Sequence, residues 1–160
     1  MKQGFVKVAS ATPRIRVADP VYNAQVICEQ AKEAAEHGAK IVVFPELCIT
    51  GYTCNDLFLQ ELLLEKAKEA LLTIVEETGQ LEALFLVGLP VDKDGRLYNV
   101  AAVLYRGRIL GMIPKKNIPM YAEFYEGRHF TPGEETVTEY RLGKQVIPFG
   151  SNLLFRCEEL

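Results

Sequence analysis

The sequence lacks an excess of charge, a long apolar run and a nucleotide-binding loop. Its 160 residues carry 18 basic and 21 acidic side chains, and a net charge of -3 gives no reason to expect nucleic acid as a partner. No apolar run approaches the roughly 20 residues that span a bilayer, so no membrane association is expected. Neither Gly-x-x-x-x-Gly-Lys nor Gly-x-Gly-x-x-Gly occurs, so the chain shows no phosphate cradle of its own.

Cysteine pairs with metal-ligand spacing are also missing. No Cys-x-x-Cys occurs among Cys28, Cys48, Cys54 and Cys157. A chain of this length buries about 68–70% of its unfolded surface and needs no disulfides to be stable. The amino terminus leads directly into a strand pattern, so no signal peptide is expected. We therefore expect free thiols and a cytoplasmic location, and the two histidines, which have no flanking ligands, predict no metal site.

The first half of the chain alternates between strand and helix patterns. Asp19-Pro20 is a strong helix start, because Asp19 can cap free N–H groups and Pro20 suits a first turn. Apolar residues then recur at helical spacing until Gly38, which is typical of a helix end. Strands are expected on either side, at 5–11 and 39–45. The second is apolar nearly throughout, as in a strand covered on both faces.

The rest of the chain predicts one more helix and then a meander. Asn55 or Asp56 can cap the helix, which is expected to run to about Thr78. Turn signals at 92–95 and 106–107 separate later strands. The expected strands are 83–89, 97–105, 108–113, 137–142, 145–149 and 152–157. This order predicts a two-layer α/β domain with helices on one face of a mixed sheet.

The most informative stretch is Phe-Pro-Glu-Leu-Cys-Ile-Thr-Gly-Tyr, from Phe44 to Tyr52. It ends an apolar strand with a proline and then a carboxylate, Glu46, at the strand edge where α/β proteins place their ligands. Thr50-Gly51 can fold the loop back over this edge, and Glu46 would then act as a proton acceptor. The alternative is a solvated loop carboxylate.

Lys115 and Lys116 follow a later strand and lie between two prolines. A lysine held near Glu46 would keep the carboxylate ionised and would stabilise an oxyanion. Only one of the two can easily face inward from an extended segment. The alternative is that both are solvated. The aromatic and acidic residues of 121–126 could wall a small polar pocket, or could only pack a loop onto the core.

These motifs resemble the nitrilase superfamily of carbon–nitrogen hydrolases, whose members use a Glu, a Lys and a Cys. Phe-Pro-Glu-Leu-x-x-Thr-Gly-Tyr contains Glu46, Pro-Lys-x-x-x-Pro-x-Tyr contains Lys115, and Pro-Phe-Gly-Ser-Asn-Leu-Leu-Phe stands at 148–155. Together they look like the N-terminal glutaminase domain of bacterial glutamine-dependent NAD synthetases. The resemblance covers nearly the whole chain. It implies an α-β-β-α sandwich, of which this α/β chain would hold an incomplete part.

The resemblance also implies residue roles. Glu46 would be the general base, and Lys115, rather than Lys116, would stabilise the oxyanion. Tyr121, Phe124 and Glu126 match positions that contact glutamine in such domains. The family's cysteine would attack the side-chain amide of glutamine, and the released ammonia would reach a synthetase domain that uses ATP and Mg²⁺. The parent protein is expected to be a homo-oligomer.

Cys157, in Cys-Glu-Glu-Leu, imitates the family's nucleophile segment but stands where the family has an ordinary strand residue. It would share one strand face with Leu153 and Phe155, which predicts a core-facing or interface-facing thiol. We therefore expect residues 1–160 to be the N-terminal part of a glutaminase domain, truncated before its nucleophile and without the synthetase domain. On this interpretation the chain alone is inactive.

Two other interpretations stay open. The first is a stand-alone nitrilase-type amidase that acts on another small amide. The second is a non-catalytic α/β interaction module, in which Glu46 and Lys115 form a structural ion pair. The length of the parent gene distinguishes the first, and glutamine hydrolysis by the parent distinguishes the second.

Overall fold

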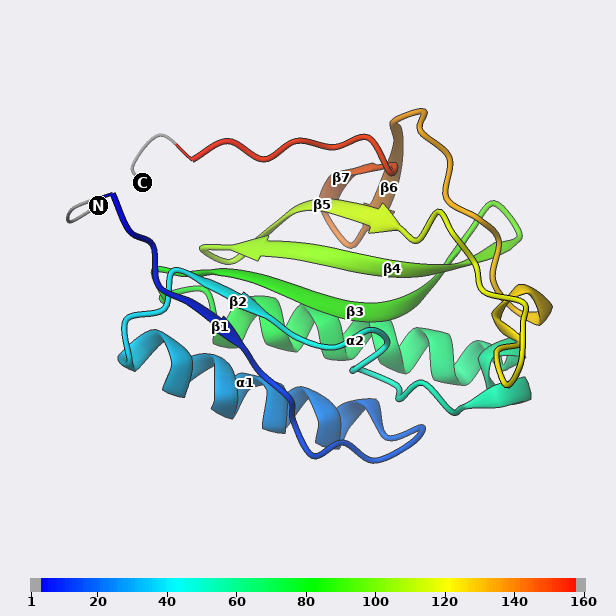
Figure 1. Ribbon diagram of the computed structural model, residues 1–160, viewed down its shortest axis with the longest axis horizontal. Helices are drawn as coiled ribbons and strands as arrows, with labels where there is room; N and C mark the ends of the chain where they lie inside the picture. Colours follow the sequence, from blue (N-terminus) through cyan, green and yellow to red (C-terminus); the bar gives the residue numbers. More distant parts are fainter. Residues whose placement is uncertain (1–3, 158–160) are drawn as a thin grey trace.

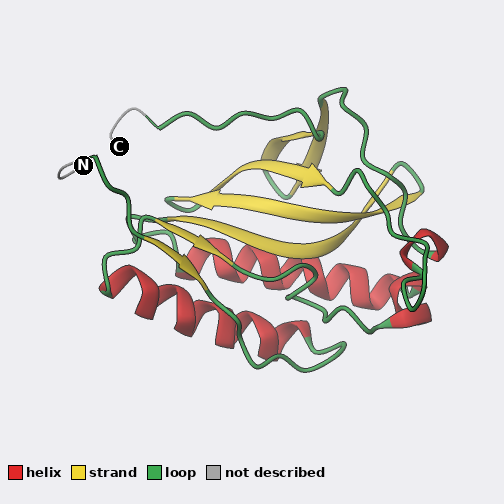
Figure 2. Ribbon diagram, in the orientation of Figure 1, coloured by secondary structure: helices red, strands yellow, loops and turns green. Residues whose placement is uncertain are grey.

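The computed structural model describes residues 4–157, which form a seven-stranded mixed sheet with two long helices on one face (Figures 1 and 2). This confirms the predicted α/β fold. The helical elements are α1 (Pro20–Glu36), η1 (Asn55–Leu59), α2 (Glu61–Glu77) and η2 (Glu126–Arg128). The strands are β1 (Val8–Ser10), β2 (Ile41–Val43), β3 (Leu84–Lys93), β4 (Arg96–Tyr105), β5 (Arg108–Pro114), β6 (Thr138–Leu142) and β7 (Gln145–Phe149). Within the described range, no helix has the length and apolarity needed to cross a membrane.

The sheet has the order β1-β2-β3-β4-β5-β7-β6. Strands β1, β2 and β3 are parallel, so their carboxyl ends meet at one edge, while β3, β4 and β5 form an antiparallel meander. Both predicted tight turns of the meander are confirmed. Asp94 and Gly95 have φ of 51° and 73°, and Arg106 and Gly107 have φ of 45° and 72°. Two successive positive φ values are the geometry that suits a two-residue hairpin.

Helix α1 begins and ends where its sequence signals predict. The Asp19 carboxylate accepts a hydrogen bond of 3.1 Å from the backbone N–H of Tyr22, and Pro20 occupies the first turn. After the helix, Gly38 adopts a φ of 81°, in the left-handed region that glycine tolerates best. These signals lie within a few residues of the helix ends, so they act without help from the rest of the fold.

The core lies between the helices and the inner face of the sheet. Ile27 of α1 and Leu71 and Ile74 of α2 are fully buried, and so are Val42 of β2 and Val87 of β3. Burying each such side chain stabilises the fold by about 1.5–3 kcal/mol. Strands β1 to β3 are therefore held rigidly against the helices, and the loops at their carboxyl ends start from fixed points.

The start of the second helix differs from the prediction. Asn55 has a φ of 50° and begins the short 3-10 helix η1, and α2 begins only at Glu61, after an extended Gln60. Neither Asn55 nor Asp56 caps α2. The Asp56 carboxylate instead accepts hydrogen bonds of 3.0 and 3.1 Å from the Arg128 guanidinium. Asp56, which the local sequence predicted as a helix cap, therefore forms a long-range ion pair instead.

Strand β2 is shorter than predicted and is not covered on both faces. Val42 points to the helices and is fully buried, whereas Val43 is 42% exposed. In the described chain the helices cover only the inner face of the sheet, so the outer face of β2 keeps its contact with solvent. The apolar run therefore correctly indicated a strand, but it did not indicate a second covering layer within these residues.

The predicted strand at 152–157 is also absent from the described residues. The segment runs extended across the outer face of β5 (Figure 1), where the Leu153 and Phe155 side chains lie over Gly111. It packs through side chains instead of pairing with a strand. Cys157 is exposed, so of the two expected positions, core-facing and interface-facing, the core-facing one is wrong. The alternation argument held for Leu153 and Phe155, which lie over the same glycine, but residues 152–157 form no strand that would carry Cys157 into the core.

Candidate active site

Glu46 lies just past the carboxyl end of β2, in a turn that closes over β3. The backbone N–H of Phe44 donates a hydrogen bond to the carbonyl oxygen of Leu86 in β3. The chain then turns through Leu47, whose φ is 53°. A Cβ on Gly88 of β3 would lie 2.4 Å from the backbone nitrogen of Leu47 and 2.6 Å from the carbonyl oxygen of Pro45. Only glycine at this position lets the turn approach the strand so closely.

Lys115 follows β5 and reaches the Glu46 carboxylate. Its Nζ donates a hydrogen bond of 2.7 Å to Glu46 Oε1. Lys116, the adjacent candidate, instead pairs with Glu135, and more than half of both side chains is exposed to solvent. The structure therefore brings Lys115, and not Lys116, to the strand-end carboxylate. The catalytic roles of Glu46 and Lys115 stay predictions.

Glu126, on η2, holds the same lysine from the other side. Lys115 Nζ lies 2.9 Å from both oxygens of the Glu126 carboxylate, which is only 6% exposed. Tyr52 Oη donates a further hydrogen bond of 2.8 Å to Glu126 Oε1. One ammonium group therefore lies between two carboxylates that are 80 residues apart in the sequence.

The surroundings of the site raise the pKa values of two of its groups, Lys115 and Tyr52. Desolvation by itself would lower the pKa of Lys115, but the hydrogen bonds that its ammonium donates to Glu126 and Glu46 outweigh it and raise that pKa. Desolvation, followed by the hydrogen bond to Glu126, raises the pKa of the Tyr52 phenol. The site therefore holds a permanent cation and a protonated phenol across the physiological pH range.

Asn99 completes the group from the middle of β4. Its side-chain Nδ2 donates a hydrogen bond to Glu46 Oε1. Its backbone carbonyl oxygen accepts a hydrogen bond of 2.7 Å from the backbone N–H of Lys115. The residue is buried, and its amide is the only strongly polar side chain in an otherwise apolar stretch of strand, 97–104. A cavity of about 370 Å³ lies beside these three residues and is also lined by Gly88.

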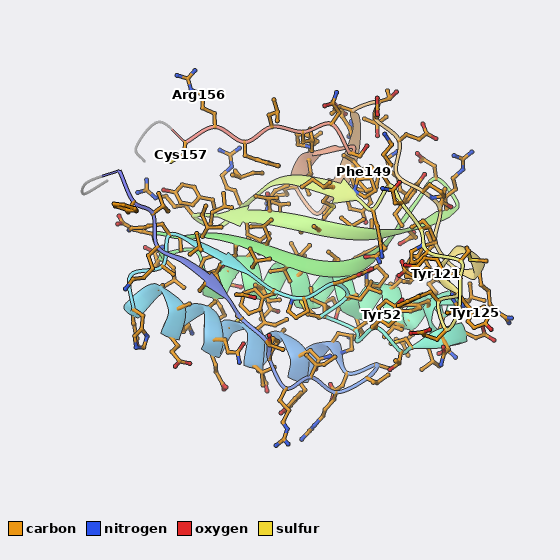
Figure 3. All side chains as sticks on the ribbon, in the orientation of Figure 1. Tyr52, Tyr121, Tyr125, Phe149, Arg156 and Cys157 are labelled. Carbon is orange, nitrogen blue, oxygen red and sulfur yellow. The ribbon has the colours of Figure 1, made fainter. Side chains whose placement is uncertain are left out.

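Tyr121, one of the predicted glutamine-contacting residues, lies at the same end of the molecule as Tyr52 (Figure 3). Tyr121 is largely exposed and meets Phe124 edge-on, with 5.5 Å between ring centroids. A smaller cavity of about 140 Å³ is lined by Tyr52, Tyr125 and Glu126. Contact of Tyr121, Phe124 and Glu126 with glutamine stays a prediction, but the segment does stand beside the Glu46–Lys115 pair.

Three of the four cysteines are unsuited to be the nucleophile. Cys28 and Cys48 are buried, and desolvation raises their pKa to about 11 and about 12, so their reactive thiolates are scarce. Desolvation also raises the pKa of Cys54. Cys48 is close to Glu46 in sequence, but its Sγ donates to the carbonyl of Gly88 within the core.

Cys157 is exposed, yet it lies far from the pair. It lines a groove with Lys40, Ile41 and Leu84, at the amino ends of β2 and β3, whereas Glu46 follows the carboxyl end of β2. Figure 3 shows Cys157 at the end of the molecule opposite Tyr52. None of the described cysteines is therefore placed to attack a carbonyl beside Glu46 and Lys115.

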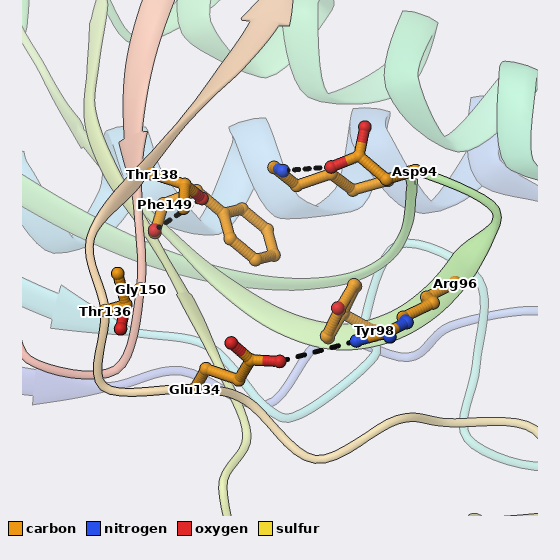
Figure 4. Close-up of a pocket in the computed structure, with 9 residues that line it drawn as sticks. Asp94, Arg96, Tyr98, Glu134, Thr136, Thr138, Phe149 and Gly150 are labelled. Atoms are coloured by element: carbon orange, nitrogen blue, oxygen red, sulfur yellow. Dashed lines mark hydrogen bonds and ion pairs between the residues drawn. The ribbon is translucent and has the colours of Figure 1, made fainter.

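A polar pocket of about 310 Å³ lies away from this site, between the β3–β4 hairpin and β7 (Figure 4). Its charged groups are paired with each other, since Arg96 lies 3.4 Å from Glu134 and Lys93 lies 2.5 Å from Asp94. Asp94, Arg96 and Glu134 are largely exposed, so water screens them. In residues 4–157 no cluster of three or more His, Cys, Asp or Glu side chains could hold a metal ion. The Glu46–Lys115 pair remains the best candidate for chemistry.

Sequence reasoning missed three features of this site. Asn99 could have been suspected, because an amide inside an apolar strand needs a buried partner. The partnership of Glu126 with Lys115, and the role of Tyr52 in fixing it, had no local signal. Both depend on how the loop at 116–126 folds back onto the strand ends.

Known proteins resemble this chain in sequence. A family model described as carbon–nitrogen hydrolase matches residues 7–152. The glutamine-dependent NAD(+) synthetase of Mycobacterium tuberculosis is 39% identical over 159 residues, which cover 99% of this chain but only 23% of that protein. This chain matches the N-terminal part of such synthetases.

Solved structures show the same fold. A glutamine-dependent NAD(+) synthetase from Cytophaga hutchinsonii superposes with a TM-score of 0.89 at 28% identity, covering 96% of this chain and 26% of that one. An amidase from Nesterenkonia sp. superposes with a TM-score of 0.67 at 23% identity, covering 89% of this chain and 54% of that one. At this sequence identity, the similarity to the amidase shows a shared fold alone.

Proposed function

The chain belongs to the carbon–nitrogen hydrolase family, and from that premise we propose that it forms the N-terminal part of a glutaminase domain in a glutamine-dependent NAD synthetase. The observation that carries the proposal is the position of Lys115 between the carboxylates of Glu46 and Glu126. A general base and a fixed cation side by side are what amide hydrolysis through a thioester requires.

The proposed reaction uses a cysteine thiol from outside residues 1–160. Glu46 takes the thiol proton, and the sulfur attacks the side-chain amide carbon of glutamine. Lys115 stabilises the negative oxygen that develops. The carbon–nitrogen bond then breaks, the nitrogen leaves as ammonia with the proton returned by Glu46, and a glutamyl thioester remains. Water, deprotonated by Glu46, attacks the thioester and releases glutamate and the thiol.

The ammonia would be consumed by a synthetase domain that lies outside this chain. ATP and Mg²⁺ belong to that domain in the proposal, and the residues of this chain are not assigned to them. The parent would be a homo-oligomer in the cytoplasm. Three buried, unpaired thiols, Cys28, Cys48 and Cys54, are consistent with a reducing compartment.

The test uses the full-length protein that carries this chain. Purified protein should release ammonia from glutamine, and Glu46→Gln should reduce the release by about 10²–10⁴-fold, the usual loss for a general base. Ammonia release from another small amide but not from glutamine would contradict the proposed substrate. A Glu46→Gln protein with full activity would contradict the proposed site.

A further inference from the structure

We propose that Asn99 is the positioning residue of this site, holding Glu46 so that the second carboxylate oxygen, Oε2, accepts the proton. The inference rests on the proposed hydrolase function and adds a residue to it. Asn99 does not touch the substrate in this proposal. It acts on the reaction only through the orientation of Glu46.

The placement of Asn99 links the two halves of the catalytic pair. Its side-chain Nδ2 donates to Glu46 Oε1, while its backbone carbonyl accepts from the backbone N–H of Lys115 at 2.7 Å. Asn99 is only 3% exposed and stands inside β4, which is paired on both sides, with β3 and with β5. A buried strand residue of this kind cannot move without moving the sheet, so it is a fixed reference point for both partners.

The two oxygens of Glu46 are not equivalent. Oε1 accepts from both Asn99 and Lys115, whereas no described residue donates to Oε2. An oxygen that already accepts two N–H groups has its lone pairs engaged, so Oε2 is the better proton acceptor. The hydrogen-bond pattern therefore selects one atom of the carboxylate as the base.

Lys115 alone could not make this selection. The terminal torsion of a glutamate has a broad, roughly two-fold energy profile, so its two oxygens exchange easily. An ammonium group has three donors on a flexible stem and can follow either oxygen. The Asn99 amide, on a rigid strand, holds its Nδ2 against one oxygen of the carboxylate. Without it the carboxylate would sample orientations in which the basic oxygen is misdirected, and a small misplacement of this kind is costly to the rate.

The test uses Asn99→Leu and Asn99→Asp in the full-length protein. Asn99→Leu should lower kcat for glutamine hydrolysis by about 10- to 100-fold, the value of a hydrogen bond to a charged group, with KM within about threefold. Asn99→Asp keeps the shape but sets a carboxylate against Glu46, so it should lose at least as much. If a variant still makes NAD from added ammonium, the variant protein is folded. The matched control, Thr78→Val, removes a buried polar group far from the site and should leave hydrolysis unchanged.

A double-mutant cycle with Glu46→Gln separates positioning from general destabilisation. If Asn99 acts through Glu46, Asn99→Leu should cost little further activity in the Glu46→Gln background. An equal loss in both backgrounds, or a tolerated Asn99→Asp, would overturn the inference. Normal activity in Asn99→Leu with an inactive Glu46→Gln protein overturns the inference alone. Full activity in Glu46→Gln overturns the proposed function itself.

Discussion

Lys115 is the residue on which the electrostatics of the site depend. It faces Glu46 on one side and Glu126 on the other, and these contacts raise its pKa. A raised lysine pKa favours the cation in the folded state. The stabilisation is therefore fully present below the ordinary lysine pKa of about 10.4 and is lost as the pH rises through the folded value.

Removing the charge of Glu126 should weaken the site without unfolding it. Glu126→Gln keeps the shape of the side chain but loses one of the two carboxylates that hold Lys115. We expect glutamine hydrolysis by the full-length protein to fall by about 10- to 100-fold. Synthesis from ammonium should persist. A variant with unchanged hydrolysis would show that Glu46 alone holds the lysine.

Tyr52 offers a spectroscopic test of the same contact. Desolvation and the Glu126 hydrogen bond raise its pKa, so Tyr52 should ionise above the ordinary tyrosine value of about 10. Since the folded-state pKa is the higher one, stability should fall as the pH rises above that value. In an ultraviolet titration, Glu126→Gln should move one late-titrating tyrosine to lower pH. Tyr140, whose pKa is raised by burial, should titrate late in both proteins.

At the scale of elements, the turn after β2 depends on a glycine in β3. Gly88→Ala would place a methyl group against the backbone of Pro45 and Leu47, and backbone cannot yield as a side-chain end can. We expect a loss of about 1–3 kcal/mol in the free energy of unfolding, measured by denaturant titration. Glutamine hydrolysis by the parent should fall with it, because Glu46 is displaced.

Gly111→Ala is the matched control for this variant. Gly111 also lies inside a strand, but the nearest atoms to the new methyl group would be the ends of the Leu153 and Phe155 side chains. These can shift, so the loss of stability should be smaller and hydrolysis should be unchanged. Equal effects of the two variants would contradict a specific role for Gly88.

The elements that the sequence predicted well have local causes. Asp19 and Gly38 define α1, and each hairpin turn carries its own positive-φ residues. The failures have distant causes. Asp56 pairs with Arg128 instead of capping α2, and 152–157 does not pair as a strand because it lies across the face of β5. Signals from neighbouring residues in the sequence could not predict partners that are so far away in the chain.

The candidate site divides in the same way. Glu46 and Lys115 stand in short motifs, so their pairing could be predicted from the sequence. Asn99 and Tyr52 join them only through the pairing of β4 with β5 and the return of a long loop. The mixture of aromatic and acidic residues near Glu126 indicated a pocket, but not that the carboxylate would hold Lys115.

At the scale of the whole molecule, one face of the sheet carries no helix within residues 4–157 (Figure 2). Val8, Ile41 and Leu84 are neighbours on that outer face, and Val8 is 63% exposed. The inner face of the same strands is buried under α1 and α2 (Figure 2). Ile41 and Leu84 are only partly buried, and neighbouring apolar side chains that keep contact with solvent favour association.

The isolated 160-residue chain should therefore self-associate. We expect its apparent mass in light scattering to rise with concentration, and Val8→Lys with Leu84→Lys should reduce this rise. Leu62→Lys is the matched control, because Leu62 is 66% exposed on α2, away from the sheet face. A chain that stays monomeric, or equal effects of the two changes, would contradict this prediction.

The most direct test of the catalytic pair compares two adjacent lysines in the full-length protein. Lys115 Nζ contacts Glu46 and Glu126, whereas Lys116 pairs with Glu135 in solvent. The ratio of glutamine-dependent to ammonium-dependent NAD formation should collapse by at least about 10²-fold in Lys115→Met, since an oxyanion-stabilising group is lost. The ratio should stay near normal in Lys116→Met. A collapse in Lys116→Met with a mild effect in Lys115→Met would contradict the account.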